Sequence, residues 1–344
     1  MTALMAGPAH AQSSVQLYGQ VDEWVGAQTF PGNKRAWVVA GGGMSTSYWG
    51  MKGSEDLGGG LKTIFALEAF FRAQNGQAGR FQGDTFFARN AYVGILSRYG
   101  TLTAGRMTSN LFVSTILFNP FVDSYPFSPM IYHTYLGTST FPAYRTDQGA
   151  VGDSGWSNAI AYASPSFSGL TGSIMYSLGN QAGAAGRHKD SAQVLYVNGA
   201  FAATAVYQYV NYKNVADDFS TPAAANVVAG LRSQSIGQLG VRYDFKIIKL
   251  YGQYMYTGNS VTTGDYHVNT GQAGFTIPLA GGNVMASYAY SKDSGGFDQN
   301  RKTWALGYDY PLSRRTDVYA AYLNDKISGE SHGDTFGVGI RAKF

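Results

Sequence analysis

The sequence predicts an all-β protein whose chain closes into a transmembrane barrel of about sixteen antiparallel strands. Three observations support this prediction. Charged residues are 13% of the 344 residues, which is about half their share in soluble domains. Glycine (45), tyrosine (25) and phenylalanine (20) are correspondingly abundant. Apolar residues alternate with small or polar residues in one segment after another, and turn sequences separate these segments.

The alternation is clearest at the C-terminus. Between Phe336 and Phe344 every second residue is apolar, and the residues between them are glycine, arginine or lysine. The same pattern recurs in residues 61–72, 170–178, 238–245 and 303–310. A period of two places the apolar set on one face of a strand. The other face is too small and polar for the dry core of a β-sandwich. The pattern therefore favours a barrel with a lipid-facing apolar exterior and a polar interior.

Short turns and long loops alternate along the chain, as an up-and-down meander requires. The short turns are 56–60, 98–100, 164–169, 244–246, 278–282 and 311–314. The long loops are 28–43, 73–85, 107–154, 179–190, 211–232, 258–265, 292–300 and 325–333. We expect the short turns at the periplasmic end of the barrel and the long loops at the outer end.

The first eleven residues are read as a shortened signal peptide. Ala9-His10-Ala11 fits the small-x-small cleavage rule, although the usual positively charged start is missing. On this interpretation the barrel spans residues 12–344. The alternative is an alanine-rich disordered tail.

The chain carries no recognisable enzyme motif, so we expect no enzyme, cofactor or metal site. The absence of cysteine excludes thiolate metal sites and a cysteine nucleophile. The five histidines are scattered, and the spacings of zinc proteases, serine hydrolases and phosphate-binding loops do not occur. A net charge of +4 is weak support for nucleic-acid binding, and we expect none. Two alternatives stay open: an outer-membrane hydrolase, and an adhesin whose lumen is plugged.

Several segments resemble the Gram-negative general porins, in particular the neisserial and burkholderial type of β-proteobacteria. They are residues 14–19, 48–60, 89–96, 100–106 and 162–169, together with the terminal Phe344. The resemblance implies a 16-stranded barrel, a homotrimer in outer-membrane lipid, and passive diffusion of small hydrophilic solutes and ions. It also implies that the third loop, residues 107–154, folds into the barrel as a constriction loop. In this family the terminal aromatic residue is read by the barrel-assembly machinery.

Strand parity suggests which charges face the lumen. It places Tyr48, Lys52, Lys62, Glu68 and Arg72 inward. Arginine facing lipid at mid-depth costs about 2–4 kcal/mol, so Arg89 and Arg106 are also expected inside. The predicted pore constriction consists of Arg106, Arg89, Arg72, Lys52, Tyr48 and Glu68 of the wall, with Asp123 and Arg145 of the loop. The alternative for each is a solvated charge on the wall or rim.

The excess of lumenal bases predicts a preference for anions, and two departures from the family make that preference weaker than in relatives. Tyr48 stands where relatives usually carry arginine, and residues 154–158 lack another arginine. The expected lumenal bases (Lys52, Lys62, Arg72, Arg89, Arg106, Arg341 and Lys343) still outnumber the acids (Asp22, Glu68 and Asp123).

The constriction loop is rich in aromatic rings. They are Phe112, Phe118, Phe121, Tyr125, Phe127, Tyr132, Tyr135, Phe141 and Tyr144. Either these rings pack the loop against the wall, or they line a constriction that favours aromatic organic acids.

Overall fold

The computed structural model describes residues 14–135, 149–180, 187–212, 231–295 and 299–344. The expected signal peptide, Arg145, Phe141 and Tyr144 lie outside these residues. Within them the strands are β1 (Ser14–Thr29), β2 (Ala36–Gly41), β3 (Tyr48–Gly58), β4 (Leu61–Arg72), β5 (Gln77–Ala78), β6 (Asn90–Ser97), β7 (Gly100–Thr108), β8 (Gly155–Ala163), β9 (Leu170–Leu178), β10 (Arg187–Asn198), β11 (Phe201–Tyr212), β12 (Leu231–Asp244), β13 (Lys249–Val261), β14 (Tyr266–Leu279), β15 (Gly282–Ser294), β16 (Asn300–Pro311), β17 (Thr316–Ile327) and β18 (Gly333–Lys343).

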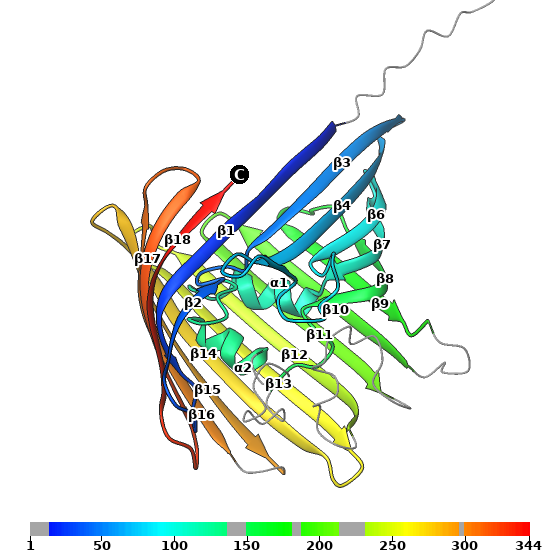
Figure 1. The fold of residues 1–344 in the computed structure, drawn as a ribbon. Coiled ribbons are helices and arrows are strands. Elements are labelled where there is room, and N and C mark those ends of the chain that lie inside the picture. The colour runs from blue at the N-terminus through cyan, green and yellow to red at the C-terminus, as the bar shows by residue number, and fades with distance from the viewer. Residues whose placement is uncertain (1–13, 136–148, 181–186, 213–230, 296–298) are drawn as a thin grey trace, which may run out of the picture.

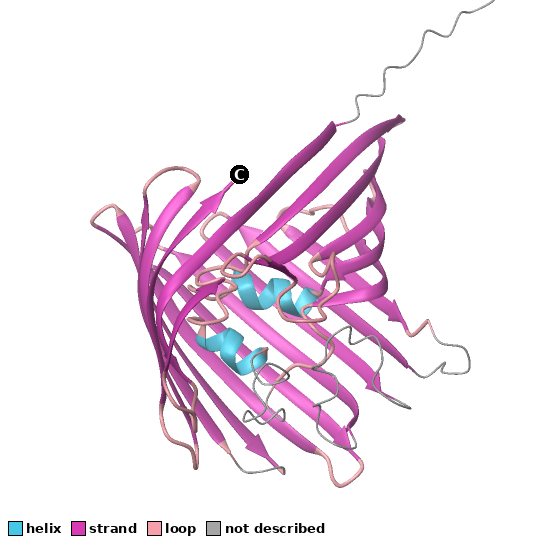
Figure 2. Cartoon of the chain, viewed as in Figure 1, coloured by secondary structure: helices cyan, strands magenta, loops and turns pink. Residues whose placement is uncertain are grey.

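The strands form one closed antiparallel barrel (Figures 1 and 2). β1 closes it, because it pairs with β18 along one edge and with β2 and β3 along the other. β2 and β3 lie along successive halves of β1 and act as one wall strand, interrupted at residues 42–47. β5 is a two-residue partner at the end of β4. Sixteen strands therefore make the wall, as the sequence predicts.

The interruption of one wall strand differs from the sequence-based expectation. Residues 28–43 were expected to form a loop, yet β1 continues to Thr29 and Ala36–Gly41 form β2. Turn signals stand at both ends of the strand, Pro31-Gly32 before it and Gly41-Gly42-Gly43 at its end, and they hid the short run between them, which pairs with β1 as a hairpin. Residues 42–47 leave the strand as a short excursion, which we call the wall excursion.

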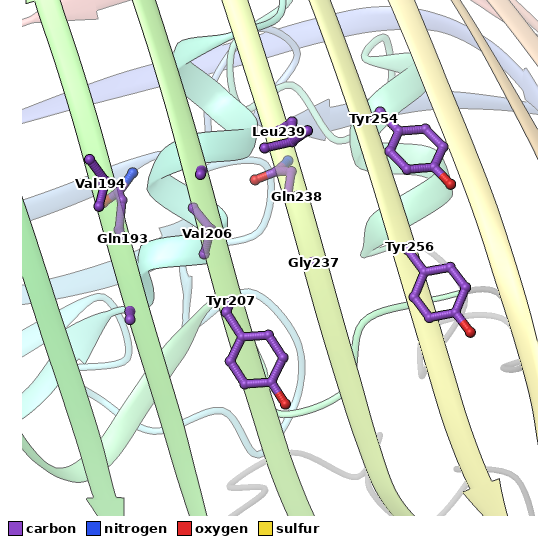
Figure 3. Close-up of a pocket in the computed structure, with 11 residues that line it drawn as sticks. Gln193, Val194, Val206, Tyr207, Gly237, Gln238, Leu239, Tyr254 and Tyr256 are labelled. Carbon is purple, nitrogen blue, oxygen red and sulfur yellow. The ribbon is translucent and has the colours of Figure 1, made fainter.

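Alternate side chains face opposite sides of the wall, as the period of two predicts. In β18 the outward Val338 is 56% exposed, whereas the inward Thr335 is 1% exposed. Figure 3 looks onto the outer face of β10–β13, where an apolar groove of about 420 Å³ is open to the surroundings. Its outward lining includes Val194, Tyr207, Leu239, Tyr254 and Tyr256, while Gln193, Val206 and Gln238 are buried on the other side.

Two short helices of the long third loop lie inside the barrel (Figure 1). Helix α1 (Asn110–Leu117) begins after Ser109, whose side chain accepts a hydrogen bond from the amide of Phe112. Helix α2 (Pro129–Thr134) begins after Ser128, which caps the amide of Ile131, and Pro129 occupies the first turn. Neither of these helices is long and apolar enough to span a membrane.

Candidate functional site: the pore constriction

The constriction loop starts where β7 ends and returns to the wall at β8. Its two ends are joined, because the amide of Ser109 donates a hydrogen bond to the carbonyl of Ser154 over 2.8 Å. α1 lies against β10–β12, and α2 lies against β14–β16. The loop therefore crosses the interior of the barrel instead of covering its mouth, as the resemblance implies.

A row of glutamines holds α1 to the wall. Gln238 of β12 donates to Thr115 Oγ1 over 3.1 Å, and Gln253 of β13 donates to the carbonyl of Thr115 over 3.1 Å. The row continues sideways from Gln238 to Gln253 (2.8 Å) and from Gln253 to Gln272 of β14 (3.2 Å). All of these side chains are buried. The amides bond to one another and also donate to the helix, so this attachment contains no charge.

His133 holds α2 to the neighbouring part of the wall, β15 and β16. Its Nε2 lies 2.8 Å from the hydroxyl of Thr303, and its Nδ1 contacts the hydroxyl of Ser291. Thr303 donates its own proton to Asp325 over 2.6 Å, so the histidine ring donates from Nε2 and accepts at Nδ1. Burial lowers the pKa of His133, and the charge of Arg301 acts in the same direction. The ring is therefore neutral.

Arg301 completes the α2 attachment. Its guanidinium pairs with Asp325 through two hydrogen bonds of 3.0 and 2.8 Å, and it also donates to the carbonyl of Tyr132 over 2.7 Å. Both charged side chains are almost fully buried. A paired and hydrogen-bonded charge is the form in which burial is tolerated.

The residues between the two helices pack against glycines of the wall. A Cβ added to Gly240 would lie 2.8 Å from the ring of Phe118, and one added to Gly307 would lie 2.9 Å from the ring of Phe121. Gly274 leaves the same room for Pro120, at 2.7 Å. Phe118, Phe121, Phe127 and Tyr132 are buried. These rings thus pack the loop against the wall, while Phe112, Tyr125 and Tyr135 are half-buried.

An ion-pair cluster fixes the end of the loop. Asp153 pairs with Arg80 and with Arg106, each over 2.8 Å. Arg80 also pairs with Asp84 over 2.9 Å. Burial raises the pKa of Asp153, but the two arginines outweigh burial and hold that pKa well below its usual range. The carboxylate therefore stays ionised.

Arg106, one of the predicted constriction residues, belongs to this cluster. Its side chain is 6% exposed, and all three guanidinium nitrogens are hydrogen-bonded. The partners are the carbonyl of Ala88, the hydroxyl of Ser157 and the carboxylate of Asp153. Arg72 is also separate from the other predicted residues, with its guanidinium 3.4 Å from the carbonyl of Ala78.

The structure brings four of the predicted wall residues together on β3, β4 and the segment before β6. Arg89 pairs with Glu68, and its guanidinium carbon lies 4.2 Å above the centre of the Tyr48 ring. Lys52 Nζ lies 4.7 Å from the ring centre of Tyr18, which itself donates to Glu68. The rings of Tyr18 and Tyr48 meet edge to face, with centres 6.2 Å apart. We call Lys52, Tyr18, Tyr48 and Arg89 the cation–aromatic row.

The carboxylate of Asp123 in the loop interacts electrostatically with the guanidinium of Arg89. The wall excursion holds it there, since Ser45 donates to Asp123 Oδ2 over 2.7 Å. The excursion is in turn fixed by Asp22 of β1, whose carboxylate accepts the amides of Gly43, Met44 and Ser45 at 2.9–3.0 Å. The hydroxyl of Tyr319 donates to the same carboxylate.

Sequence reasoning missed some functional contacts. Tyr18 follows the inward parity of β1, so its alternation with Leu17 could have found it. Ser45 carried no signal, because its contact with Asp123 joins segments far apart in the chain. Within the described residues, no group of three or more histidine or acidic side chains could hold a metal ion.

Comparisons with known proteins agree with this architecture. The sequence model of the Gram-negative porin family matches residues 1–330. The outer membrane porin protein 32 of Delftia acidovorans is 30% identical, with 98% of this chain and 90% of the relative covered. An outer membrane porin protein of Bordetella pertussis is 28% identical, with 100% of this chain and 98% of the relative covered.

Solved structures share the fold. The anion-selective porin from Comamonas acidovorans superposes with a TM-score of 0.79 at 24% identity, over 97% of this chain and 100% of the other. OmpT of Vibrio cholerae, in a trimer form, gives a TM-score of 0.70 at 15% identity, over 96% and 99% of the two chains. The closed barrel, the inward third loop and a family match over nearly the whole sequence lead to one conclusion: this chain belongs to the Gram-negative porin family and is an outer-membrane porin of the β-proteobacterial type.

Proposed function

We propose that this porin is a homotrimer whose channels pass small hydrophilic solutes by diffusion, with a weak preference for anions. Porins are channels rather than enzymes, and the similarity therefore favours this function over a hydrolase. The trimer form of OmpT and the anion-selective porin of Comamonas acidovorans support the assembly and the preference, respectively.

The observation that carries the anion preference is the unequal exposure of the charges that strand parity places in the lumen. Glu68 and Asp22 are buried, and their oxygens accept hydrogen bonds from neighbouring side chains and amides. Lys52 and Lys62 are exposed, and the side chain of Arg89 is 33% exposed. A passing ion therefore meets unused cationic donors more readily than unused carboxylate oxygens.

We further propose that the cation–aromatic row favours organic acids with a planar ring. Tyr18 and Tyr48 offer aromatic surface between two cations, and a benzoate-like solute needs both a cation for its carboxylate and a ring face or edge. The family resemblance implies an arginine in relatives at the position of Tyr48, so we expect this surface to be particular to this chain. The constriction as a whole is proposed to comprise Lys52, Tyr48, Glu68, Arg89 and Asp123, with Arg72 and Arg106 outside this group.

The test is a planar-bilayer measurement on the purified trimer. Under a salt gradient the reversal potential should indicate a modest preference for chloride over potassium. Benzoate should then reduce the chloride current more strongly than cyclohexanecarboxylate, which has the same charge and similar size but no aromatic face. Tyr48→Leu should remove that difference.

Tyr207→Leu is the matched control, because Tyr207 lies on the outer face and should leave both solutes unaffected. Equal block by the two acids in the wild type would contradict the aromatic preference. A strongly cation-selective channel would contradict the anion preference, and the absence of conductance would contradict an open pore.

A further inference from the structure

One arginine of the second long loop, residues 73–85, reaches the end of the constriction loop. Arg80 donates to both carboxylate oxygens of Asp153, at 2.8 and 3.0 Å, and to the hydroxyl of Ser154 at 3.2 Å. Its side chain is 12% exposed. A loop expected only at the outer end of the barrel therefore contacts the constriction loop of the same chain.

A tight turn fixes Arg80 from its own side. The carboxylate of Asp84 accepts the backbone amide of Arg80 at 2.9 Å, and also its Nε at 2.9 Å and its Nη2 at 3.1 Å. Gly79 has a φ of +77°, and a Cβ there would lie 2.6 Å from Cβ of Asp84, so the turn requires glycine. The guanidinium also lies 5.4 Å from the ring centres of Phe70 and Phe81. These contacts orient the side chain towards Asp153.

Asp153 lies where the constriction loop returns to the wall, in a backbone conformation that side chains rarely adopt. Its φ is +67°. The next residue, Ser154, accepts the hydrogen bond from Ser109 that joins the two ends of the loop. A residue in such a conformation persists where its surroundings hold it. The contacts of the Asp153 carboxylate therefore bear directly on the closure of the loop.

Arg80 supplies more of these contacts than Arg106 does. Arg106 gives Asp153 one nitrogen, at 2.8 Å, and directs the others to Ala88 and Ser157. Arg80 gives two nitrogens in the paired geometry that suits a carboxylate. Buried ion pairs are a weak source of net stability, and their best-attested use is to fix one arrangement over another.

We propose that Arg80 is a positioning residue of the constriction: it holds Asp153 from the second loop and so fixes the return of the constriction loop to the wall. Its charge has a second effect. Arg80 and Arg106 together match the charges of Asp84 and Asp153, so loss of Arg80 leaves one unmatched negative charge beside the pore.

The first experiment measures hydrogen exchange of backbone amides in the purified trimer. Arg80→Gln should speed exchange in residues 149–157 by about tenfold or more, because the return of the loop opens more often. Helix α1, which the glutamine row holds, should change by less than about twofold. Exchange in residues 149–157 as slow as in the wild type would overturn the proposal. Equal acceleration in α1 would mean general loosening and would also overturn it.

Arg98→Gln is the matched control. Arg98 is an exposed arginine in the turn between β6 and β7, and its guanidinium carbon lies 4.6 Å from the ring centre of Tyr99. The same substitution there should change exchange in residues 149–157 by less than about twofold. An effect as large as that of Arg80→Gln would show that loss of any arginine suffices, against the proposal.

Arg80→Lys separates position from charge. Lysine keeps the charge but lacks the planar fork that binds two carboxylate oxygens. Exchange in residues 149–157 should therefore rise, while the reversal potential under a salt gradient stays that of the wild type. Arg80→Gln should raise exchange and also shift the reversal potential towards cation preference. Wild-type exchange in the lysine variant would mean that Arg80 acts by charge alone, and the positioning role would be wrong.

A double variant tests whether Arg80 acts through Asp153. In an Asp153→Asn background, Arg80→Gln should add less than about twofold to the exchange rate, since the contact it removes is already weakened. Fully additive effects of the two substitutions would contradict the proposal. The exchange measurements need no conducting pore, so a failure of the proposed channel function would appear in the electrical recordings alone.

Discussion

Ser45 of the barrel wall donates a hydrogen bond of 2.7 Å to the carboxylate of Asp123 in the constriction loop. Asp22 positions the backbone of Ser45, and the amide of Gln20 donates to its hydroxyl. The position of Asp123, whose carboxylate interacts with the charge of Arg89, is thus set by an interruption in the wall strand and not by the loop alone.

Ser45→Ala should loosen the constriction loop. The substitution removes a hydrogen bond to a charged group, which contributes about 1.5–3 kcal/mol. Single-channel recordings should then have greater current noise in the open state. Thr46→Ala is the control, because the hydroxyl of Thr46 makes no hydrogen bond within the described residues. Unchanged noise in the Ser45 variant would mean that other contacts suffice to hold Asp123.

Arg89→Gln and Glu68→Gln should shift the ion preference in opposite directions. The first leaves the carboxylate of Glu68 without its arginine and should reduce anion preference, whereas the second frees Arg89 and should increase it. Tyr48→Arg should also increase it. Reversal potentials measure all three. The differences should shrink between 0.1 and 1 M salt, since the screening length falls from about 10 to about 3 Å. A shift of the same sign for Arg89→Gln and Glu68→Gln would contradict this arrangement.

Asp153 should make the channel sensitive to strong acid. Its folded pKa lies below the unfolded value of about 4, so its pairing stabilises the protein above pH 4 and is lost as pH falls through the folded pKa. The unfolding temperature should thus be constant from pH 7 to about pH 5 and fall below about pH 4. Asp153→Asn should be less stable at neutral pH and lose less on acidification. Glu55→Gln, at an exposed wall position, should follow the wild type.

Gly307→Ala should disturb the packing of the constriction loop against the wall. The added methyl group would lie 2.9 Å from the ring of Phe121, and overpacking of this kind costs about 1–3 kcal/mol. We expect a lower unfolding temperature and a wider spread of conductances. Gly237→Ala tests the same change on the outer face, where a Cβ meets nothing within 4 Å, and should be neutral. Equal unfolding temperatures and conductances of the two variants would show that the close contact between Phe121 and Gly307 does not matter for the position of the loop.

Phe344→Ser should reduce insertion into the outer membrane more than it changes conductance. The backbone of Phe344 pairs with Gly19 of β1 in both directions, at 3.2 and 3.1 Å, so this residue lies at the seam of the barrel. The amount of heat-modifiable folded protein in membranes measures insertion. Phe336→Ser removes a similar outward ring within the same strand and should reduce it less. An unchanged yield for the Phe344 variant would mean that this side chain contributes to packing but not to insertion.

Alternation predicted the barrel because it depends only on neighbours in sequence. Each strand must offer an apolar face to lipid, and that requirement acts on every second residue, as in β18 between Phe336 and Lys343. The inward parity of Tyr48, Lys52 and Glu68 followed from the same rule.

Contacts between distant segments could not be predicted in this way. Arg106 and Asp153 carry charges that suit a pore, yet they pair with each other because a β-bulge after Gly105 and the return of the loop bring them together. The choice between packing and lining for the loop rings likewise depended on Gly240 and Gly307, which belong to strands more than a hundred residues away. The composition identified the aromatic rings of the loop but not the wall glycines against which they pack.

The glutamine row on β12–β14 has a consequence for how the channel responds to its surroundings. Amide-to-amide hydrogen bonds carry no net charge, so dissolved salt does not screen them and no proton titrates there near neutral pH. The aperture beside α1 should therefore keep its width in fresh and in brackish water. Discrimination between ions, in contrast, fades as salt rises. Selection of solutes by size beside α1 and selection of ions by charge should therefore respond differently to salt.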